Sequence, residues 1–158
     1  MRRIKRISAW ILTLAILLTL TVPALAASGV QNEVQGSAAY MVSAVKSPEV
    51  GSIGGEWAII GLARSGYTVP ANYYDDYYAR VEKYVKNCSG VLHERKYTEY
   101  SRVILALTAL GEDATKFTGS NSTVYNLVEP LFEKNGSTYR VSEQGNNGTA
   151  FALIALDS

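Results

Sequence analysis

Three apolar segments of similar sequence recur along this chain and restrict it most strongly to a repeat architecture. The three segments are Trp57-Ala58-Ile59-Ile60-Gly61-Leu62, Arg102-Val103-Ile104-Leu105-Ala106-Leu107 and Phe151-Ala152-Leu153-Ile154-Ala155-Leu156. With the small residues Gly61, Ala106 and Ala155 in register, the segments are 45 and 49 residues apart. Each segment is apolar nearly all round, which is typical of a buried helix. A repeat of this length indicates stacked copies of one supersecondary unit.

Helices of a different kind are predicted between the buried segments. Over residues 73–88, apolar side chains recur three and four residues apart, which predicts an amphipathic helix with its charged residues on the other side. A weaker pattern of this kind covers about residues 33–46 and ends before Pro48, because the residue that precedes a proline avoids the helical conformation. A third amphipathic helix is predicted over about residues 122–132, where Pro130 interrupts it.

Each amphipathic helix can pair with the buried helix that follows it, which gives three helical hairpins. Glycine-containing linkers at residues 66–70, 89–90 and 135–137 separate the helices. Strand-like alternation is not found, although residues 91–92 and 139–141 could form short extended pieces. The predicted fold class is therefore all-α, with an outer and an inner helix in each of about three hairpins.

The N-terminus has the pattern of a secretory signal peptide. Four basic residues stand in the first six positions, an apolar run covers residues 7–22, and a small-residue triplet follows at 24–26. The alternative is a membrane anchor, but a spanning helix needs roughly 20 apolar residues and this run is shorter. We therefore expect residues 1–26 to be removed. The domain, residues 27–158, would then be secreted or held at the cell surface without stable membrane insertion.

Removal of the signal changes the net charge. Residues 1–26 hold four of the 15 basic residues and none of the 14 acidic ones, which leaves 11 against 14 and a net charge of −3. A mildly acidic domain without a basic cluster lacks the electrostatic pattern of a nucleic-acid-binding protein, so no nucleic-acid partner is expected. Cys88 is the only cysteine, so no intrachain disulfide can form.

The segments around the buried helices resemble a known family. The resemblance rests on Gly54-Gly55-Glu56-Trp57-Ala58-Ile59-Ile60-Gly61-Leu62-Ala63, Tyr97-Thr98-Glu99-Tyr100-Ser101-Arg102 and Gly145-Asn146-Asn147-Gly148-Thr149-Ala150-Phe151. These segments resemble the secreted bacterial branch of the prenyltransferase/squalene-oxidase repeat proteins. The resemblance covers roughly residues 34–158 and implies an α/α toroid, the fold shared with terpenoid cyclases, protein prenyltransferase β-subunits and cobalamin carriers. A full ring of this kind has six hairpins, so three hairpins would make half a ring.

The resemblance also implies candidate ligand-binding residues, because the N-termini of the inner helices face the central cavity of such a ring. Carried onto this chain, these positions are Glu56, Trp57, Tyr97, Glu99, Tyr100, Arg102, Gln144, Asn146 and Asn147. Each position also has a structural interpretation. Glu56 and Glu99 suit the first turn of a helix, where the helix dipole favours acids, and Asn147 suits an N-cap. Trp57 and Tyr100 could simply pack in the core.

Catalytic and metal-binding motifs are not found in the sequence. Asp75-Asp76 lacks the D-x-D-D spacing of class II terpenoid cyclases, and it falls on the polar side of its predicted helix. Cys88 and His93 supply only two of the four ligands of a zinc site. Serine nucleophile elbows and phosphate loops are not found either, so no catalytic residue, metal or cofactor is predicted. The 11 tyrosines could form a carbohydrate platform, but their helical spacing favours contacts in the core.

Two classes of function remain open. The first is a secreted or surface-associated, non-catalytic binding or scaffold module for an unknown small-molecule or protein ligand. The second is the N-terminal half of a terpenoid cyclase-like enzyme, or of a cobalamin-carrier-like binder, whose functional residues lie beyond residue 158. The last predicted helix, residues 151–156, ends without a polar cap. This indicates a chain truncated at its C-terminus, although a short complete protein is the alternative, and self-association through an exposed apolar edge of this helix is expected.

Overall fold

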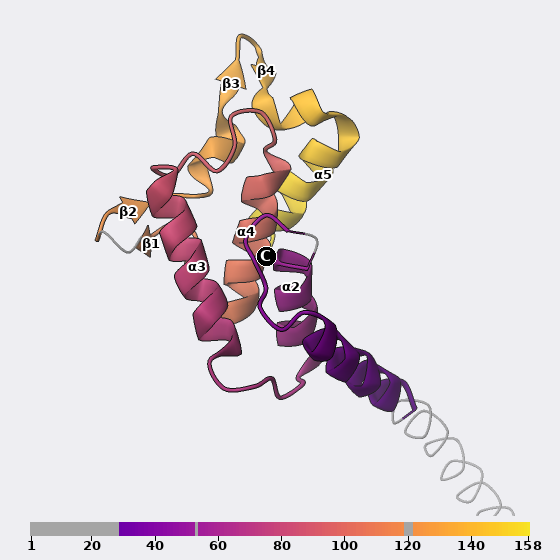
Figure 1. The fold of residues 1–158 in the computed structure, drawn as a ribbon. Helices are drawn as coiled ribbons and strands as arrows, with labels where there is room; N and C mark the ends of the chain where they lie inside the picture. The colour runs from indigo at the N-terminus through magenta and orange to yellow at the C-terminus, as the bar shows by residue number, and fades with distance from the viewer. Residues whose placement is uncertain (1–28, 53, 119–121) are drawn as a thin grey trace, which may run out of the picture. The chain divides into compact units, whose positions relative to one another are not determined.

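The computed structural model describes residues 29–52, 54–118 and 122–158, and the predicted signal peptide lies outside these residues. The chain divides into two units, Met1–Ser37 and Ala38–Ser158. Of the first unit, the described residues are helical, and helical structure extends through residue 44. The second unit contains everything described below (Figure 1). None of the described helices is both long enough and apolar enough to cross a membrane.

The second unit is mainly helical, with two short antiparallel β-ladders. Its α-helices are α2 (Glu56–Ser65), α3 (Tyr73–Asn87), α4 (Thr98–Leu110) and α5 (Gly145–Leu156), and its 3₁₀ helices are η1 (Glu129–Phe132) and η2 (Arg140–Gln144). Strand β1 (Phe117–Thr118) pairs with β2 (Val124–Tyr125), and β3 (Lys134–Asn135) pairs with β4 (Thr138–Tyr139). Each of the four strands is two residues long, so the ladders hold loops in place and do not form a separate sheet layer.

The three apolar repeats form adjacent helices, with α4 packed between α2 and α5 (Figure 1). Helix α4 is the centre of the core, where Val103, Ile104 and Leu107 are almost completely buried. Ile59 and Leu62 of α2 are buried against it in the same cluster. The prediction of three buried helices is thus confirmed for α2 and α4.

Helix α5 differs from α2 and α4 because it buries only its small residues. Gly148, Ala152 and Ala155 are buried, whereas Leu153 and Ile154 are 62% and 54% exposed. The exposed apolar edge predicted for this helix is therefore present.

Helix α3 is the predicted amphipathic outer helix. Tyr77, Val81 and Val85 are completely buried on one side of it, while Asp75 and Asp76 are exposed on the other. Burial of these apolar side chains at three- and four-residue spacing supplies most of the stability of such a helix.

The prediction of a third amphipathic helix over residues 122–132 is wrong. This segment instead contains β2, an irregular turn and η1. The Oδ1 atom of Asn126 accepts hydrogen bonds from the backbone N–H groups of Val128 and Glu129, at N–O distances of 3.0 and 3.1 Å. Such side-chain to backbone bonds stabilise a turn in place of a helix, and Pro130 cannot donate a helical hydrogen bond. The apolar spacing that suggested a helix comes from Leu127 and Leu131, which anchor the turn in the core.

The start of α5 also differs from the prediction. The helix begins at Gly145, so Asn147 lies in its first turn and is not the N-cap. Gln144 occupies the N-cap position, but its side chain bonds to α4. The C-terminal caps follow the sequence pattern, since Gly66 and Gly111 end α2 and α4 in the left-handed conformation, with φ of 67° and 85°.

Candidate binding pocket

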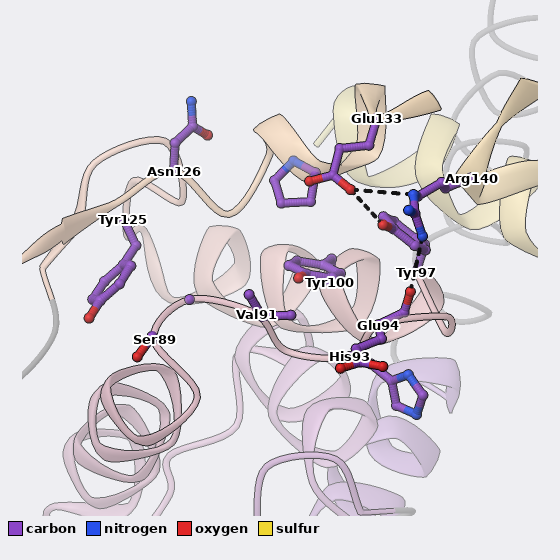
Figure 2. A pocket seen from close by; sticks show the side chains of 12 residues that line it. Ser89, Val91, His93, Glu94, Tyr97, Tyr100, Tyr125, Asn126, Glu133 and Arg140 are labelled. Carbon is purple, nitrogen blue, oxygen red and sulfur yellow. Dashed lines mark hydrogen bonds and ion pairs between the residues drawn. The ribbon is translucent and has the colours of Figure 1, made fainter. Parts of the chain in front are cut away.

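An open pocket of about 510 Å³ lies between the loop that joins α3 to α4 and the irregular segment after β2. Figure 2 shows that tyrosines and charged side chains line it from both sides. Its lining residues are Ser89, Gly90, Val91, His93, Glu94, Tyr97, Tyr100, Tyr125, Asn126, Pro130, Glu133 and Arg140. The volume falls within the range typical of small-molecule sites, roughly 300–1,000 Å³.

Two stacked tyrosines at the start of α4 line the pocket. The rings of Tyr97 and Tyr100 have centroids 5.6 Å apart and an interplanar angle of 27°. Both residues are only 3% exposed, so their rings are held in place by the core. The hydroxyl of Tyr100 accepts a hydrogen bond from the backbone N–H of Leu92 at 3.1 Å, and the hydroxyl of Tyr84 donates one to the carbonyl of Leu92 at 3.1 Å. These two bonds fix the loop that forms one wall of the pocket.

A hydrogen-bonded charge pair lies beside Tyr97. The hydroxyl of Tyr97 donates to Oε2 of Glu133 at 2.7 Å, and the same oxygen lies 3.7 Å from Nε of Arg140. Arg140 also donates from a terminal guanidinium nitrogen to the carbonyl of Glu94 at 3.5 Å. Burial, followed by the hydrogen bond and charge of Glu133, raises the pKa of Tyr97 to about 12, although Arg140 opposes this shift. Tyr97 therefore remains a hydrogen-bond donor at neutral pH.

Tyr125 borders the pocket from a different segment of the chain. It ends β2, and its half-buried ring lies against the backbone of Gly90. A Cβ atom at position 90 would lie 2.7 Å from Cδ1 of Tyr125, which is closer than such atoms approach in proteins. Gly90 also has a φ of +84°, a conformation that side chains disfavour. Glycine at this position thus allows the ring to lie directly over the loop.

His93 stabilises the loop between α3 and α4 through hydrogen bonds to its backbone. Its Nδ1 atom accepts hydrogen bonds from the backbone N–H groups of Arg95 and Lys96, at 3.0 and 3.1 Å. In the neutral imidazole the proton is therefore on Nε2.

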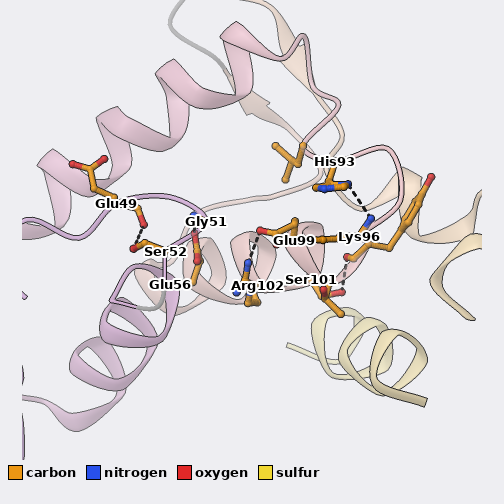
Figure 3. Close-up of polar contacts among 12 residues, drawn as sticks. Glu49, Gly51, Ser52, Glu56, His93, Lys96, Glu99, Ser101 and Arg102 are labelled. Atoms are coloured by element: carbon orange, nitrogen blue, oxygen red, sulfur yellow. Dashed lines mark hydrogen bonds and ion pairs between the residues drawn. The ribbon is translucent and has the colours of Figure 1, made fainter. Parts of the chain in front are cut away.

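A second group of polar residues, which includes the buried Glu56 and the partly exposed Glu99 and Arg102, lies on α2 and α4 (Figure 3). Glu56 is completely buried, and its Oε1 atom accepts hydrogen bonds from the backbone N–H of Gly51 at 2.7 Å and from the hydroxyl of Tyr77 at 3.4 Å. Arg102 and Glu99 form an ion pair one helical turn apart. Among the described residues, Oε2 of Glu56 and Nε of Arg102 are buried without a hydrogen-bond partner.

The buried carboxylate changes the chemistry of Tyr77. Burial raises the pKa of Tyr77 above its ordinary value, and the charge and hydrogen bond of Glu56 raise it further. Arg102 lowers it by a smaller effect. Tyr77 therefore remains a donor to Glu56, and the buried acid links α2 to α3 and to the loop at Gly51.

The structure distributes the candidate residues predicted from the sequence over several places. Tyr97 and Tyr100 line the pocket, whereas Glu56, Glu99 and Arg102 belong to the buried polar group (Figure 3). The remaining candidates lie elsewhere, with Trp57 in α2, Gln144 at the end of η2, and Asn146 and Asn147 in α5.

Two of these remaining candidates have structural roles. The Oε1 atom of Gln144 accepts from the backbone N–H of Thr98 at 2.9 Å, and its Nε2 donates to the hydroxyl of Thr98 at 3.2 Å, so Gln144 caps α4. Trp57 packs against Phe151, with ring centroids 5.7 Å apart. Asn146 and Asn147 are exposed at the start of α5.

Several pocket residues were not predicted, namely His93, Glu94, Tyr125, Asn126, Glu133 and Arg140. Tyr125 and Asn126 fall within the helix predicted over residues 122–132, and the other four lie in the loop before α4 or in the segment after η1. The abundance of tyrosine was the one sequence feature that pointed to an aromatic binding site. Because most tyrosines are spaced as in a helix, they were assigned to the core instead.

The described residues contain no group of three or more histidine, cysteine, aspartate or glutamate side chains that is able to hold a metal ion. Cys88 is half-buried, and burial raises the pKa of its thiol, which disfavours the reactive thiolate. Comparison of the chain with protein-family models, with curated proteins and with solved structures found no match.

Proposed function

We propose that this chain is an exported, non-catalytic binding module, and that the tyrosine-lined pocket is its binding site. The observation that carries this proposal is the pocket itself, with a volume of about 510 Å³ and rigid aromatic rings beside a charge pair that solvent reaches. Pockets that combine aromatic surface with a few fixed polar groups are the usual form of a small-molecule site. Export is proposed from the basic, apolar and small-residue pattern of residues 1–26.

For the fold, we propose helical hairpin repeats of the prenyltransferase/squalene-oxidase type. The side-by-side packing of α2, α4 and α5 supports this. So does the register of the repeat, because Glu56 and Ser101 are equivalent positions when Gly61 and Ala106 are aligned, and both are completely buried polar residues. The departure at residues 122–132 leaves the third hairpin without a regular outer helix.

Binding without catalysis is favoured by how the polar groups of the pocket are already engaged. Nδ1 of His93 accepts two backbone hydrogen bonds, so the unprotonated nitrogen of the neutral imidazole is not free to take a proton from a ligand. Glu133 accepts a hydrogen bond from Tyr97 and forms an ion pair with Arg140. These bonds hold side chains in position, which lowers the entropic cost of binding a ligand.

The proposal is tested by filling the pocket. Val91 lines the pocket and is 53% exposed, so Val91→Trp adds a bulky ring there without removing a core contact. Val124→Trp is a matched control, because Val124 is 61% exposed on β2 and does not line the pocket. Ligand-observed NMR with a library of small polar compounds should give hits that Val91→Trp abolishes and Val124→Trp retains. Hits that survive Val91→Trp would place the binding site elsewhere.

A further inference from the structure

We infer that the pocket binds a neutral carbohydrate, with one pyranose ring against Tyr125 and its hydroxyl groups on the charge pair. This inference rests on the proposed function and specifies its ligand class. Three features of the pocket lead to it, namely the half-buried ring of Tyr125, its charges of both signs and its opening to solvent.

The aromatic surface that a ligand can reach comes from Tyr125 of β2. Tyr97 and Tyr100 are stacked on each other at the start of α4 and are only 3% exposed, so they offer no ring face to a ligand, whereas the ring of Tyr125 is half-buried. Figure 2 shows the ring of Tyr125 near Ser89 and that of Tyr100 near Val91. The face of an aromatic ring carries partial negative charge, and one face of a pyranose presents C–H groups with partial positive charge. Weak C–H contacts of this kind favour stacking of a sugar ring on a tyrosine.

The charges of the pocket argue against an ionic ligand. Glu94 and Glu133 contribute two carboxylates, and Arg140 contributes one guanidinium that lies 3.7 Å from Glu133. An anionic ligand that approaches Arg140 would also meet these carboxylates, and a cationic one would meet Arg140. The net charge of these three groups is −1, which repels an anion, while Arg140 opposes a cation beside Glu133.

The same charge pair suits vicinal hydroxyl groups. The side chains of Arg140 and Glu133 are 36% and 52% exposed, so a ligand can reach both. A hydroxyl group both donates and accepts hydrogen bonds, so one hydroxyl of a sugar can donate to the carboxylate while its neighbour accepts from the guanidinium. An entirely apolar ligand would instead remove this charge pair from water without replacing its hydrogen bonds, at a considerable cost.

The experiment uses the purified chain and four neutral probes, namely cello-, malto-, xylo- and chito-oligosaccharides. Isothermal titration and saturation-transfer NMR would measure binding to the unmodified chain and to Tyr125→Ala. We expect one probe series to bind, and Tyr125→Ala to weaken its affinity about three- to tenfold, the usual size of one lost aromatic contact. Tyr139→Ala is the control, because Tyr139 is an exposed tyrosine on β4 outside the pocket. It should change the affinity less than twofold.

Charged probes distinguish the failure of this inference from the failure of the proposed function. Oligogalacturonates that bind more tightly than the neutral sugars would overturn the assignment of a neutral ligand. Binding of other small molecules that Val91→Trp abolishes, without binding of any sugar, would overturn the carbohydrate and leave the binding function standing. Sugar binding that is equal in the unmodified chain and in Tyr125→Ala would overturn the placement of the sugar in this pocket. Absence of binding by every compound would overturn both proposals.

Discussion

Glu56 is a buried acid that works as a structural acceptor for two different segments. Its Oε1 atom bonds the backbone N–H of Gly51 and the hydroxyl of Tyr77. Glu56→Ala would leave both donors buried without an acceptor, and we expect it to lower the free energy of unfolding by about 2–4 kcal/mol. Glu56→Gln keeps a carbonyl oxygen at the position of Oε1 and removes the buried charge, so we expect a smaller loss. Urea unfolding of the two variants, side by side, measures the difference.

Equal losses for Glu56→Ala and Glu56→Gln would contradict this account. That result would mean that the charge of the carboxylate, and not its acceptor oxygen, stabilises the loop at Gly51.

Tyr97 offers a prediction about pH. Because the pKa of Tyr97 is raised from 10.0 to about 12 in the folded chain, the protonated phenol is favoured by folding. The associated stability is complete below pH 10 and is lost as the pH rises toward about 12. Glu133→Gln removes the charge that contributes to the shift, so the pKa of Tyr97 should fall, although burial will keep it above 10.0. Alkaline titration of the phenolate absorbance measures this.

Glu129→Gln is the control for this titration, because Glu129 is an exposed acid of η1 that does not contribute to the pKa of Tyr97. An alkaline titration of Glu133→Gln that overlays the unmodified chain would show that burial alone raises the pKa.

At the scale of elements, the loop between α3 and α4 depends on Gly90. Gly90→Ala would force a side chain at φ +84° and bring its Cβ to 2.7 Å from Tyr125. Gly136→Ala is a matched control, since Gly136 has a φ of +64° and no atom within 4 Å of such a Cβ. Both variants should lose about 1 kcal/mol of stability from backbone strain. Gly90→Ala should lose more, and it should also displace Tyr125 and weaken ligand binding, as thermal unfolding and titration would show.

If Gly90→Ala and Gly136→Ala behave alike in both measurements, the close contact between Gly90 and Tyr125 has no role in shaping the pocket.

Elements with a long regular pattern could be predicted from the sequence, and irregular ones could not. The periodicity of residues 73–88 and the apolar repeats led directly to α3, α2, α4 and α5, because burial at helical spacing leaves a clear pattern. The segment at 122–132 has similar spacing, but the hydrogen bonds of Asn126 to the backbone override it. Helix propensity and apolar spacing do not reveal where a side chain bonds to the backbone and so favours a turn over a helix.

The pocket was only half predictable for the same reason. Tyr97 and Tyr100 lie at the start of a regular helix, and the family resemblance pointed to both of them as candidate ligand-binding residues. Glu133 and Arg140 approach each other because the β3–β4 ladder folds the chain back, so that the backbone N–H of Arg140 donates to the carbonyl of Glu133 at 2.9 Å. Two-residue strands carry too few side chains to show alternation in the sequence.

At the scale of the whole molecule, the apolar edge of α5 predicts self-association. Leu153, Ile154 and Leu156 are 62%, 54% and 42% exposed, and they line one shallow hollow of about 480 Å³ with Asp157. A contiguous apolar patch of this kind favours contact with another apolar surface. We expect the occupant to be the same edge of a second copy, because a twofold dimer buries identical patches against each other. The net charge of −3 over residues 27–158 is too small to oppose this strongly.

Light scattering after size exclusion, over a hundredfold range of concentration, measures this association. The unmodified chain should gain mass toward a dimer as the concentration rises, whereas the double variant Leu153→Lys/Ile154→Lys should remain a monomer, because its charges oppose burial of the edge. Val91→Lys/Val124→Lys is the control, since it adds the same charge at exposed valines outside α5. A dimer that persists in the α5 variant would exclude this edge as the interface. A monomer at every concentration of the unmodified chain would show that a patch of three apolar side chains is too small to hold two copies together.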